Sequence, residues 1–129
     1  MDGKVIFSIG HSNRSKEEFL ELLRKYEIEA IADVRRFPTS KFEIYKKENL
    51  EKILGEIEYF HFENLGGFRH GYKKWMETDE WKKEYEKLKE IAEAKKVAIL
   101  CAEKLPFRCH RRHILKKFEE EGWKVINII

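Results

Sequence analysis

Four stretches of the chain are continuously apolar and lack the polar alternation of a half-exposed strand. They cover residues 5–9, 30–34, 97–102 and 125–129. Such runs are typical of strands that are buried on both faces of a parallel sheet. A fifth stretch, residues 57–62, has a similar character. The pattern therefore predicts five strands.

Helical patterns lie between these runs. The first opens at Ser15 with Glu18 three residues later, which is the signature of a capping box. Apolar residues then follow at helical spacing: Phe19, Leu20, Leu22, Leu23 and Tyr26. The alternation of strands and helices predicts an α/β fold. We expect one three-layer Rossmann-like domain over residues 1–129, with a mostly parallel five-stranded sheet in the order 3-2-1-4-5.

The amino-acid composition indicates the environment in which we expect this protein to work. Charged residues make up 40% of the 129 positions, a lysine- and glutamate-rich style typical of proteins from hot environments. The chain shows no apolar leader and no run of the roughly 18 apolar residues that a membrane span needs. We expect a cytoplasmic protein with no membrane partner. Its two cysteines are then expected to be reduced at rest.

Polar residues follow four of the predicted strands. Ligands of α/β sheets bind at the carboxyl ends of strands, near the point where strand order reverses. The residues at these ends are His11, Ser12, Asp33, Arg35, Gly66, Gly67, Arg69, Cys101 and Glu103. If the first and fourth strands are neighbours, His11, Ser12, Cys101 and Glu103 share one crevice. The two adjacent glycines let backbone amides approach a ligand.

The segment 100–113 is the most unusual part of the chain. It holds both cysteines, and six Lys or Arg residues but no acid lie between Lys104 and Phe118. Pro106 favours a helix that begins there or slightly later. In that helix His110 and Arg111 fall on the inward stripe, in the first turns, where helix amides and the dipole favour an anion. An anion site is therefore expected.

The cysteines allow several interpretations. Cys101 is either a small buried residue at a strand end or a nucleophile whose pKa is lowered by arginines and a helix start. Cys101, Cys109, His110 and His113 supply four zinc-type ligands, although their spacing is not that of a familiar zinc motif, and no metal is assigned. A Cys101–Cys109 disulfide is the least favoured alternative in a reducing compartment.

Other side chains also keep two interpretations. His11 is either a general base or a residue that caps the next helix. Asp33 and Arg35 form either a structural ion pair or part of a ligand site. Glu103 either orients an arginine or exchanges protons. We take Cys101, His11 and Glu103 as the candidate catalytic residues.

Five motifs, in order, resemble the domain of unknown function 488 family: SIGHSN, DVRRFPTS, LGGFR, KWMET and LCAEKLPFRCHRR. The resemblance covers nearly the whole chain. It implies a compact α/β domain with these motifs around one pocket, and it implies no particular reaction. The positions that it brings to this pocket are His11, Ser12, Asp33, Arg35, Gly66, Gly67, Arg69, Cys101, Glu103, Cys109, His110 and Arg111.

Two functions follow as hypotheses. The first is an enzyme that acts on an anionic substrate, a phosphate-containing small molecule, nucleotide or nucleic acid, with arginines holding the anion. Ser12, Asp33, Arg35, Gly66, Gly67, Arg69, Cys109, His110 and Arg111 are its candidate substrate-binding residues. The second is a non-catalytic module that binds nucleic acid or protein, with structural or zinc-bound cysteines. The sequence identifies no cofactor and no oligomeric state. Convergence of four strand ends on one pocket favours the enzyme.

Overall fold

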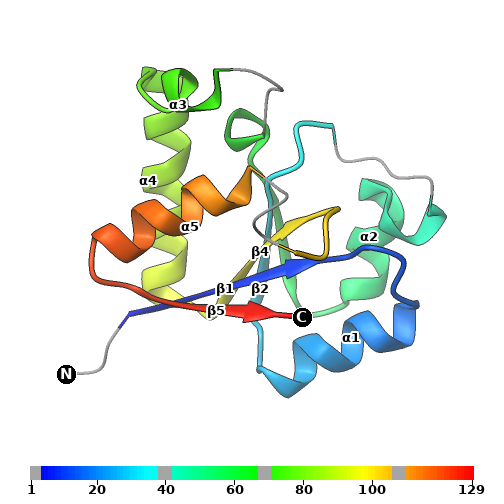
Figure 1. Ribbon diagram of the computed structural model, residues 1–129. Helices are drawn as coiled ribbons and strands as arrows, with labels where there is room; N and C mark the ends of the chain where they lie inside the picture. The colour runs from blue at the N-terminus through cyan, green and yellow to red at the C-terminus, as the bar shows by residue number, and fades with distance from the viewer. Residues whose placement is uncertain (1–3, 38–41, 67–70, 106–109) are drawn as a thin grey trace.

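A computed structural model describes residues 4–37, 42–66, 71–105 and 110–129 (Figure 1). Its strands are β1 (Val5–Gly10), β2 (Ala30–Asp33), β3 (Glu58–His61), β4 (Val97–Cys101) and β5 (Lys124–Ile128). Its α-helices are α1 (Lys16–Lys25), α2 (Lys47–Leu54), α3 (Tyr72–Trp75), α4 (Asp79–Ala94) and α5 (Arg111–Glu120). Two short 3-10 helices, η1 (Glu43–Tyr45) and η2 (Glu63–Leu65), lie between them.

The five strands form one sheet in which every pair of neighbours is parallel. The predicted α/β class and five-stranded sheet are therefore confirmed. The order is β3-β2-β4-β1-β5, so β4 and β1 are exchanged relative to the predicted 3-2-1-4-5. Both strands are almost wholly buried, and hydrophobicity alone does not say which of them borders β2. Their predicted adjacency is correct, because Gly10 pairs with Cys101.

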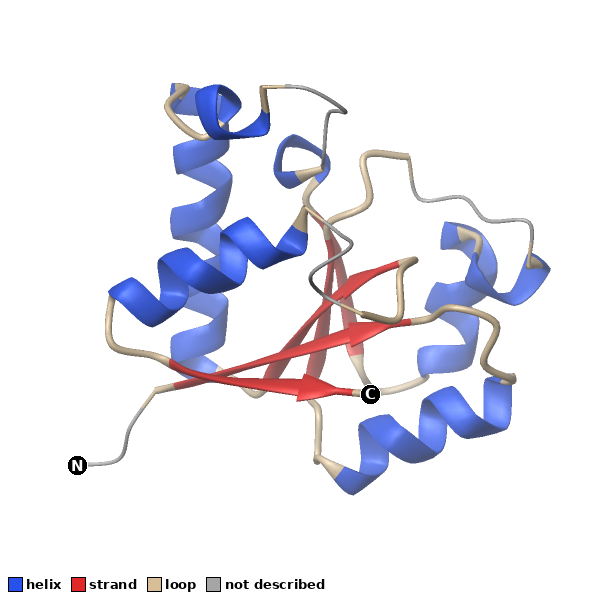
Figure 2. Cartoon of the chain, in the orientation of Figure 1, coloured by secondary structure: helices blue, strands red, loops and turns tan. Residues whose placement is uncertain are grey.

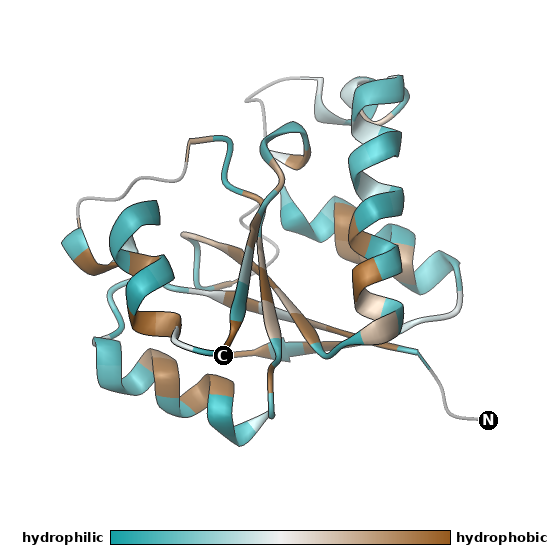
Figure 3. Cartoon of the chain, turned by 180° about the vertical axis from the view of Figure 1, so that it is seen from behind, coloured by the Kyte–Doolittle hydropathy of each residue, from teal (hydrophilic) through white to brown (hydrophobic). Residues whose placement is uncertain are grey.

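Helices cover both faces of the sheet (Figures 1 and 2). One apolar cluster joins α1 and α2 to Ile9, Ile31 and Leu100. The other joins α4 and α5 to Ile6, Ala32 and Ile99. Figure 3 shows the corresponding pattern, with hydrophobic positions gathered on the strands and on parts of the helices that cover them. This is the predicted three-layer arrangement.

The local signals that open α1 are realised in the structure. The hydroxyl of Ser15 accepts a hydrogen bond from the backbone N–H of Glu18, whose carboxylate accepts one from the N–H of Ser15. Phe19 and Leu23 are fully buried on the face that this cap directs toward the sheet. In the described part of the chain, no helix combines the length and the apolar character of a membrane span.

The sheet separates the functional side chains by face. Successive residues of a strand point to opposite sides, so Cys101 belongs with Ile99 on the α4 and α5 side. Asp33 follows Ile31 by two residues and points to the α1 and α2 side. The candidate site therefore has two halves, which meet only beyond the strand ends.

Candidate functional site

The ends of β1 and β4 are joined by backbone contacts. The N–H of His11 donates to the carbonyl of Cys101 at 3.0 Å, and the N–H of Ser12 donates to that of Ala102 at 2.9 Å. Gly10 permits this approach, because a Cβ atom at that position would lie 1.7 Å from the carbonyl oxygen of Glu103. Ser12 has a φ of 46°, a left-handed conformation that is uncommon for a residue with a side chain. The structure thus brings His11, Ser12, Cys101 and Glu103 to one edge.

Asp33 and Arg35 form a buried ion pair on the α1 and α2 side. The side chains are 0% and 6% exposed, and Nη2 of Arg35 lies 2.6 Å from Oδ2 of Asp33. Nε of Arg35 also donates to the carboxylate, and so does the hydroxyl of Tyr59. Burial alone would lower the pKa of Arg35, but the hydrogen bonds and charge of Asp33 raise it. Burial and the charge of Asp33 also raise the pKa of Tyr59.

His11 is packed against this pair. Nη1 of Arg35 donates to the carbonyl of Tyr45 at 2.7 Å and lies 3.5 Å from Nε2 of His11. The imidazole stacks on the ring of Tyr45, with centroids 4.3 Å apart. Its Nδ1 lies 2.9 Å from the carbonyl oxygen of Ser12, so Nδ1 carries the proton and Nε2 the lone pair. Burial lowers the pKa of His11, and the charge of Arg35 lowers it further, so the ring is neutral at pH 7.

Arg111 lies on the α4 and α5 side, in the first turn of α5. It is 1% exposed, and its Nη2 donates to the carbonyls of Glu103 at 2.9 Å and Lys104 at 3.0 Å. Burial lowers its pKa to about 10, although the carboxylate of Glu103 acts in the opposite direction. The side chain of Glu103 is exposed, so it is the backbone of this residue that orients the arginine.

His110 connects the two halves. Its Nε2 donates to the carbonyl of Val34 at 2.8 Å, which ties the start of α5 to the end of β2. Burial lowers the pKa of His110, and the charge of Arg111 contributes to the decrease. The inward positions predicted for His110 and Arg111 agree with these contacts.

Cys101 is buried (2% exposed) and disulfide-bonded. The other cysteine of the chain, Cys109, lies outside the described residues. The expectation that Cys101 is a reduced thiol is therefore not met in this structure. A sequence gives no direct signal for the oxidation state of a thiol, because oxidation depends on spatial proximity and on the redox environment. A nucleophilic Cys101 requires reduction first.

Gly66 supports the edge from the third strand. A Cβ atom there would lie 2.4 Å from Cα of Arg36, so only glycine lets the two backbones approach this closely. The predicted substrate-binding residues Gly67 and Arg69, like Cys109, lie outside the described residues. Within the described ranges, no three His, Cys, Asp or Glu side chains are grouped to hold a metal ion.

These motifs correspond to a known family. A comparison with protein families matches residues 15–118 to the family described as domain of unknown function DUF488. The chain belongs to the DUF488 family. No curated protein and no solved structure matches it. The DUF488 match extends from the cap of α1 to α5 and so contains β2, β3, β4 and the first turn of α5.

Three residues that contact the candidate site were not predicted from the sequence: Tyr45, Tyr59 and His61. Tyr59 and His61 both lie in the predicted third strand, and His61 donates from Nε2 to the carbonyl of Arg35 at 2.7 Å. Their polar groups in an otherwise apolar run were a usable signal. No comparable sequence signal pointed to Tyr45, because it follows an irregular segment and its ring meets that of His11 only in the folded protein.

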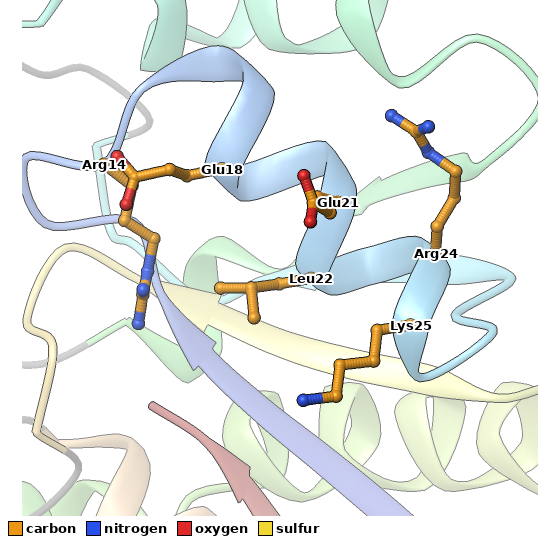
Figure 4. A pocket seen from close by; sticks show the side chains of 6 residues that line it. All are labelled: Arg14, Glu18, Glu21, Leu22, Arg24 and Lys25. Carbon is orange, nitrogen blue, oxygen red and sulfur yellow. The ribbon is translucent and has the colours of Figure 1, made fainter.

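A surface pocket of about 590 Å³ opens beside α1. Its lining is mostly charged and consists of Arg14, Glu18, Glu21, Leu22, Arg24 and Lys25 (Figure 4). Arg14 is the member of this lining that also touches the edge of the sheet, since its Nε donates to the carbonyl of Gly10 at 3.0 Å.

Proposed function

We propose that the carboxyl edge of the sheet binds an anionic, phosphate-containing substrate, such as a nucleotide or nucleic acid, and that the protein acts on it as an enzyme. The observation that carries this proposal is the buried cation at Arg111. Its Nη2 donates to the carbonyls of Glu103 and Lys104, and its pKa falls to about 10 because burial outweighs the attraction of Glu103. An anion beside the guanidinium would offset this desolvation.

Arginine suits this task chemically. Its planar fork makes paired hydrogen bonds to phosphate oxygens, and each charge-assisted contact contributes about 1.5 to 3 kcal/mol. The first turn of α5 adds backbone N–H groups and the positive end of a helix dipole. His110 belongs to the same turn and completes the proposed binding surface.

His11 is the proposed proton-transfer group. It is neutral at pH 7 and has its lone pair at Nε2, as a general base requires. Asp33, Arg35 and Tyr45 are positioning residues in this scheme, because they hold the imidazole and each other by direct contacts. Cys101 contributes as a nucleophile only after its disulfide is reduced.

The alternative is a non-catalytic nucleic-acid or protein-binding module. The disulfide of Cys101 and the buried ion pair of Asp33 and Arg35 favour it, because both are structural uses of residues that an enzyme would need for chemistry. Activity that depends on reductant would support the enzyme with Cys101 as nucleophile. Binding without turnover in either redox state would support the module.

Anion binding is tested by thermal shift with phosphate, sulfate and a nucleotide. We expect each to raise the Tm of the wild type, less so with added chloride. Arg111→Ala should remove most of the increment, and Arg111→Lys should restore little because it lacks the fork. Arg112→Ala is the matched control, since Arg112 is the next residue of the same helix turn but is exposed. An unchanged increment in Arg111→Ala would refute the proposal.

A further inference from the structure

A further arginine, Arg14, lies just beyond the end of β1. It is partly buried, in the turn between β1 and α1, and its N–H donates to the carbonyl of His11 at 3.0 Å. Its Nε donates to the carbonyl of Gly10 at 3.0 Å. The guanidinium is thereby fixed at the end of β1.

One end of this guanidinium is unsatisfied. Nη2 of Arg14 is buried and makes no hydrogen bond with any residue that the structure describes. A buried N–H group without an acceptor is costly, and in a native protein it calls for an explanation, such as a bound water or ion. Arg14 therefore offers donors that the described protein does not use.

The carboxylate of Glu18 does not accept a hydrogen bond from this nitrogen. Glu18 experiences the charge of Arg14, but its carboxylate accepts the N–H of Ser15 in the capping box. Figure 4 shows the guanidinium of Arg14 directed away from the carboxylate of Glu18. The charge of Arg14 thus faces the edge of the sheet.

Arg111 approaches the same place from the α5 side. Arg14 is bonded to the carbonyl of Gly10, Arg111 is bonded to the carbonyl of Glu103, and the Gly10 and Glu103 backbones are in close contact. The two cations are near enough that the charge of Arg14 helps to lower the pKa of Arg111. Two like charges held at the same edge of the sheet repel each other, and an anion that binds between them would reduce this repulsion.

We propose that Arg14 is the second arginine of the anion site, and that Arg14 and Arg111 together bind a phosphate monoester dianion in preference to a phosphodiester. This inference rests on the proposed anion-binding function. Two guanidinium groups match the two negative charges and three terminal oxygens of a monoester. A diester carries one charge and exposes only two free oxygens, so it balances the charge of only one of the two arginines and offers fewer acceptors.

The test is calorimetric titration with inorganic phosphate, adenosine monophosphate and dimethyl phosphate. Wild type should bind the first two and bind dimethyl phosphate at least about 10-fold more weakly, the factor expected when one charge-assisted contact is lost. Arg14→Ala should weaken phosphate binding by about 10-fold or more and remove the preference over dimethyl phosphate. Adenosine monophosphate that binds better than phosphate would indicate a nucleotide rather than free phosphate.

The matched control is Arg24→Ala, because Arg24 lines the same pocket but is exposed on α1. It should bind phosphate as the wild type does. Arg14→Lys keeps the charge without the fork and should lose much of the affinity, and it serves as the test variant if Arg14→Ala does not fold. A structural role for Arg14 predicts the opposite pattern: Tm falls without ligand and phosphate affinity stays unchanged.

The outcomes separate this inference from the proposed function. If Arg111→Ala abolishes phosphate binding while Arg14→Ala and Arg14→Lys bind it normally, the anion site stands and the role of Arg14 is refuted. If wild type binds neither phosphate nor adenosine monophosphate, the proposed function fails and the inference fails with it. If both single variants lose binding while keeping the wild-type Tm, the pair is established.

Discussion

Arg35 and Arg111 are two buried arginines at the same edge of the sheet, yet their surroundings differ. Arg35 has a carboxylate at 2.6 Å, and Asp33 holds its pKa above the usual value despite burial. Arg111 donates to backbone carbonyls, and burial lowers its pKa to about 10. At Arg35 the attraction of Asp33 outweighs the effect of burial on the pKa, whereas at Arg111 burial outweighs the attraction of Glu103.

The difference separates structural from functional use of the same residue type. A buried charge that already has its counter-ion stabilises the fold only as long as both partners are present. A buried charge for which desolvation outweighs the nearby attraction lowers stability, and a ligand of opposite charge would recover part of that free energy on binding. Substitutions at the two arginines should therefore have opposite consequences for folding and for anion binding.

The largest expected effect comes from Arg35→Met. It should lower the free energy of unfolding by about 3 to 5 kcal/mol, because the carboxylate of Asp33 stays buried without its partner. Urea unfolding followed by circular dichroism measures the loss. The double variant Asp33→Asn/Arg35→Met should be more stable than Arg35→Met, since it removes the orphaned charge as well. A single variant that loses less than about 1 kcal/mol would contradict a structural ion pair.

Much of the fold could be predicted from the sequence. The apolar runs identified all five strands, and the Ser15 and Glu18 signal gave the start of α1 correctly. The order of β1 and β4 could not be obtained in this way, because both strands are apolar throughout and either could border β2. The strand order is visible only in the three-dimensional structure, in which Asp33 of β2 pairs with Leu100 of β4. Gly10, at the end of β1, makes room for the backbone of the loop after β4.

The site was predicted as a set of positions rather than as a set of interactions. His11, Asp33, Arg35, Cys101, His110 and Arg111 do gather at one edge, because parallel strands end on the same side. The alternatives for each residue needed coordinates. Asp33 and Arg35 proved to be an ion pair, Glu103 contacts Arg111 through its carbonyl, and Cys101 is oxidised.

A smaller effect is expected from Gly10→Ala, which acts on the Arg111 side. The new Cβ would meet the carbonyl of Glu103, and a backbone atom cannot move aside as a flexible side chain does. We expect a loss of about 1 to 3 kcal/mol, typical of overpacking. Because Glu103 also holds Arg111, the phosphate-induced rise in Tm should shrink. Gly66→Ala, which crowds Arg36 instead, should lower the Tm but leave that rise intact.

The pH dependence of stability should be smaller still and should involve both sides. Burial lowers the pKa values of His11, beside Arg35, and His110, beside Arg111. As pH falls through about 6.5, the unfolded chain binds protons at these residues before the folded protein does. Stability should therefore decrease below about pH 6.5 and be independent of these two groups above it. His11→Gln and His110→Gln should each make the decrease in Tm between pH 7 and 5 less steep. If the Tm of both variants falls with pH as steeply as that of the wild type, the two rings are not buried in the neutral form.

The smallest change in stability is expected for Arg111→Met, the variant that compares most directly with Arg35→Met. Replacing this buried charge with an apolar side chain of similar length removes a desolvation cost and fills much of the same space. It also removes two hydrogen bonds to the carbonyls of Glu103 and Lys104, whose residues are exposed and can be hydrated instead. These terms oppose each other, so the free energy of unfolding should change by no more than about 1 kcal/mol, while phosphate no longer raises the Tm. Urea unfolding with and without phosphate, run beside Arg35→Met, compares the two arginines directly. If Arg111→Met loses as much stability as Arg35→Met, both arginines are structural and the difference between the two sides of the sheet carries no functional meaning.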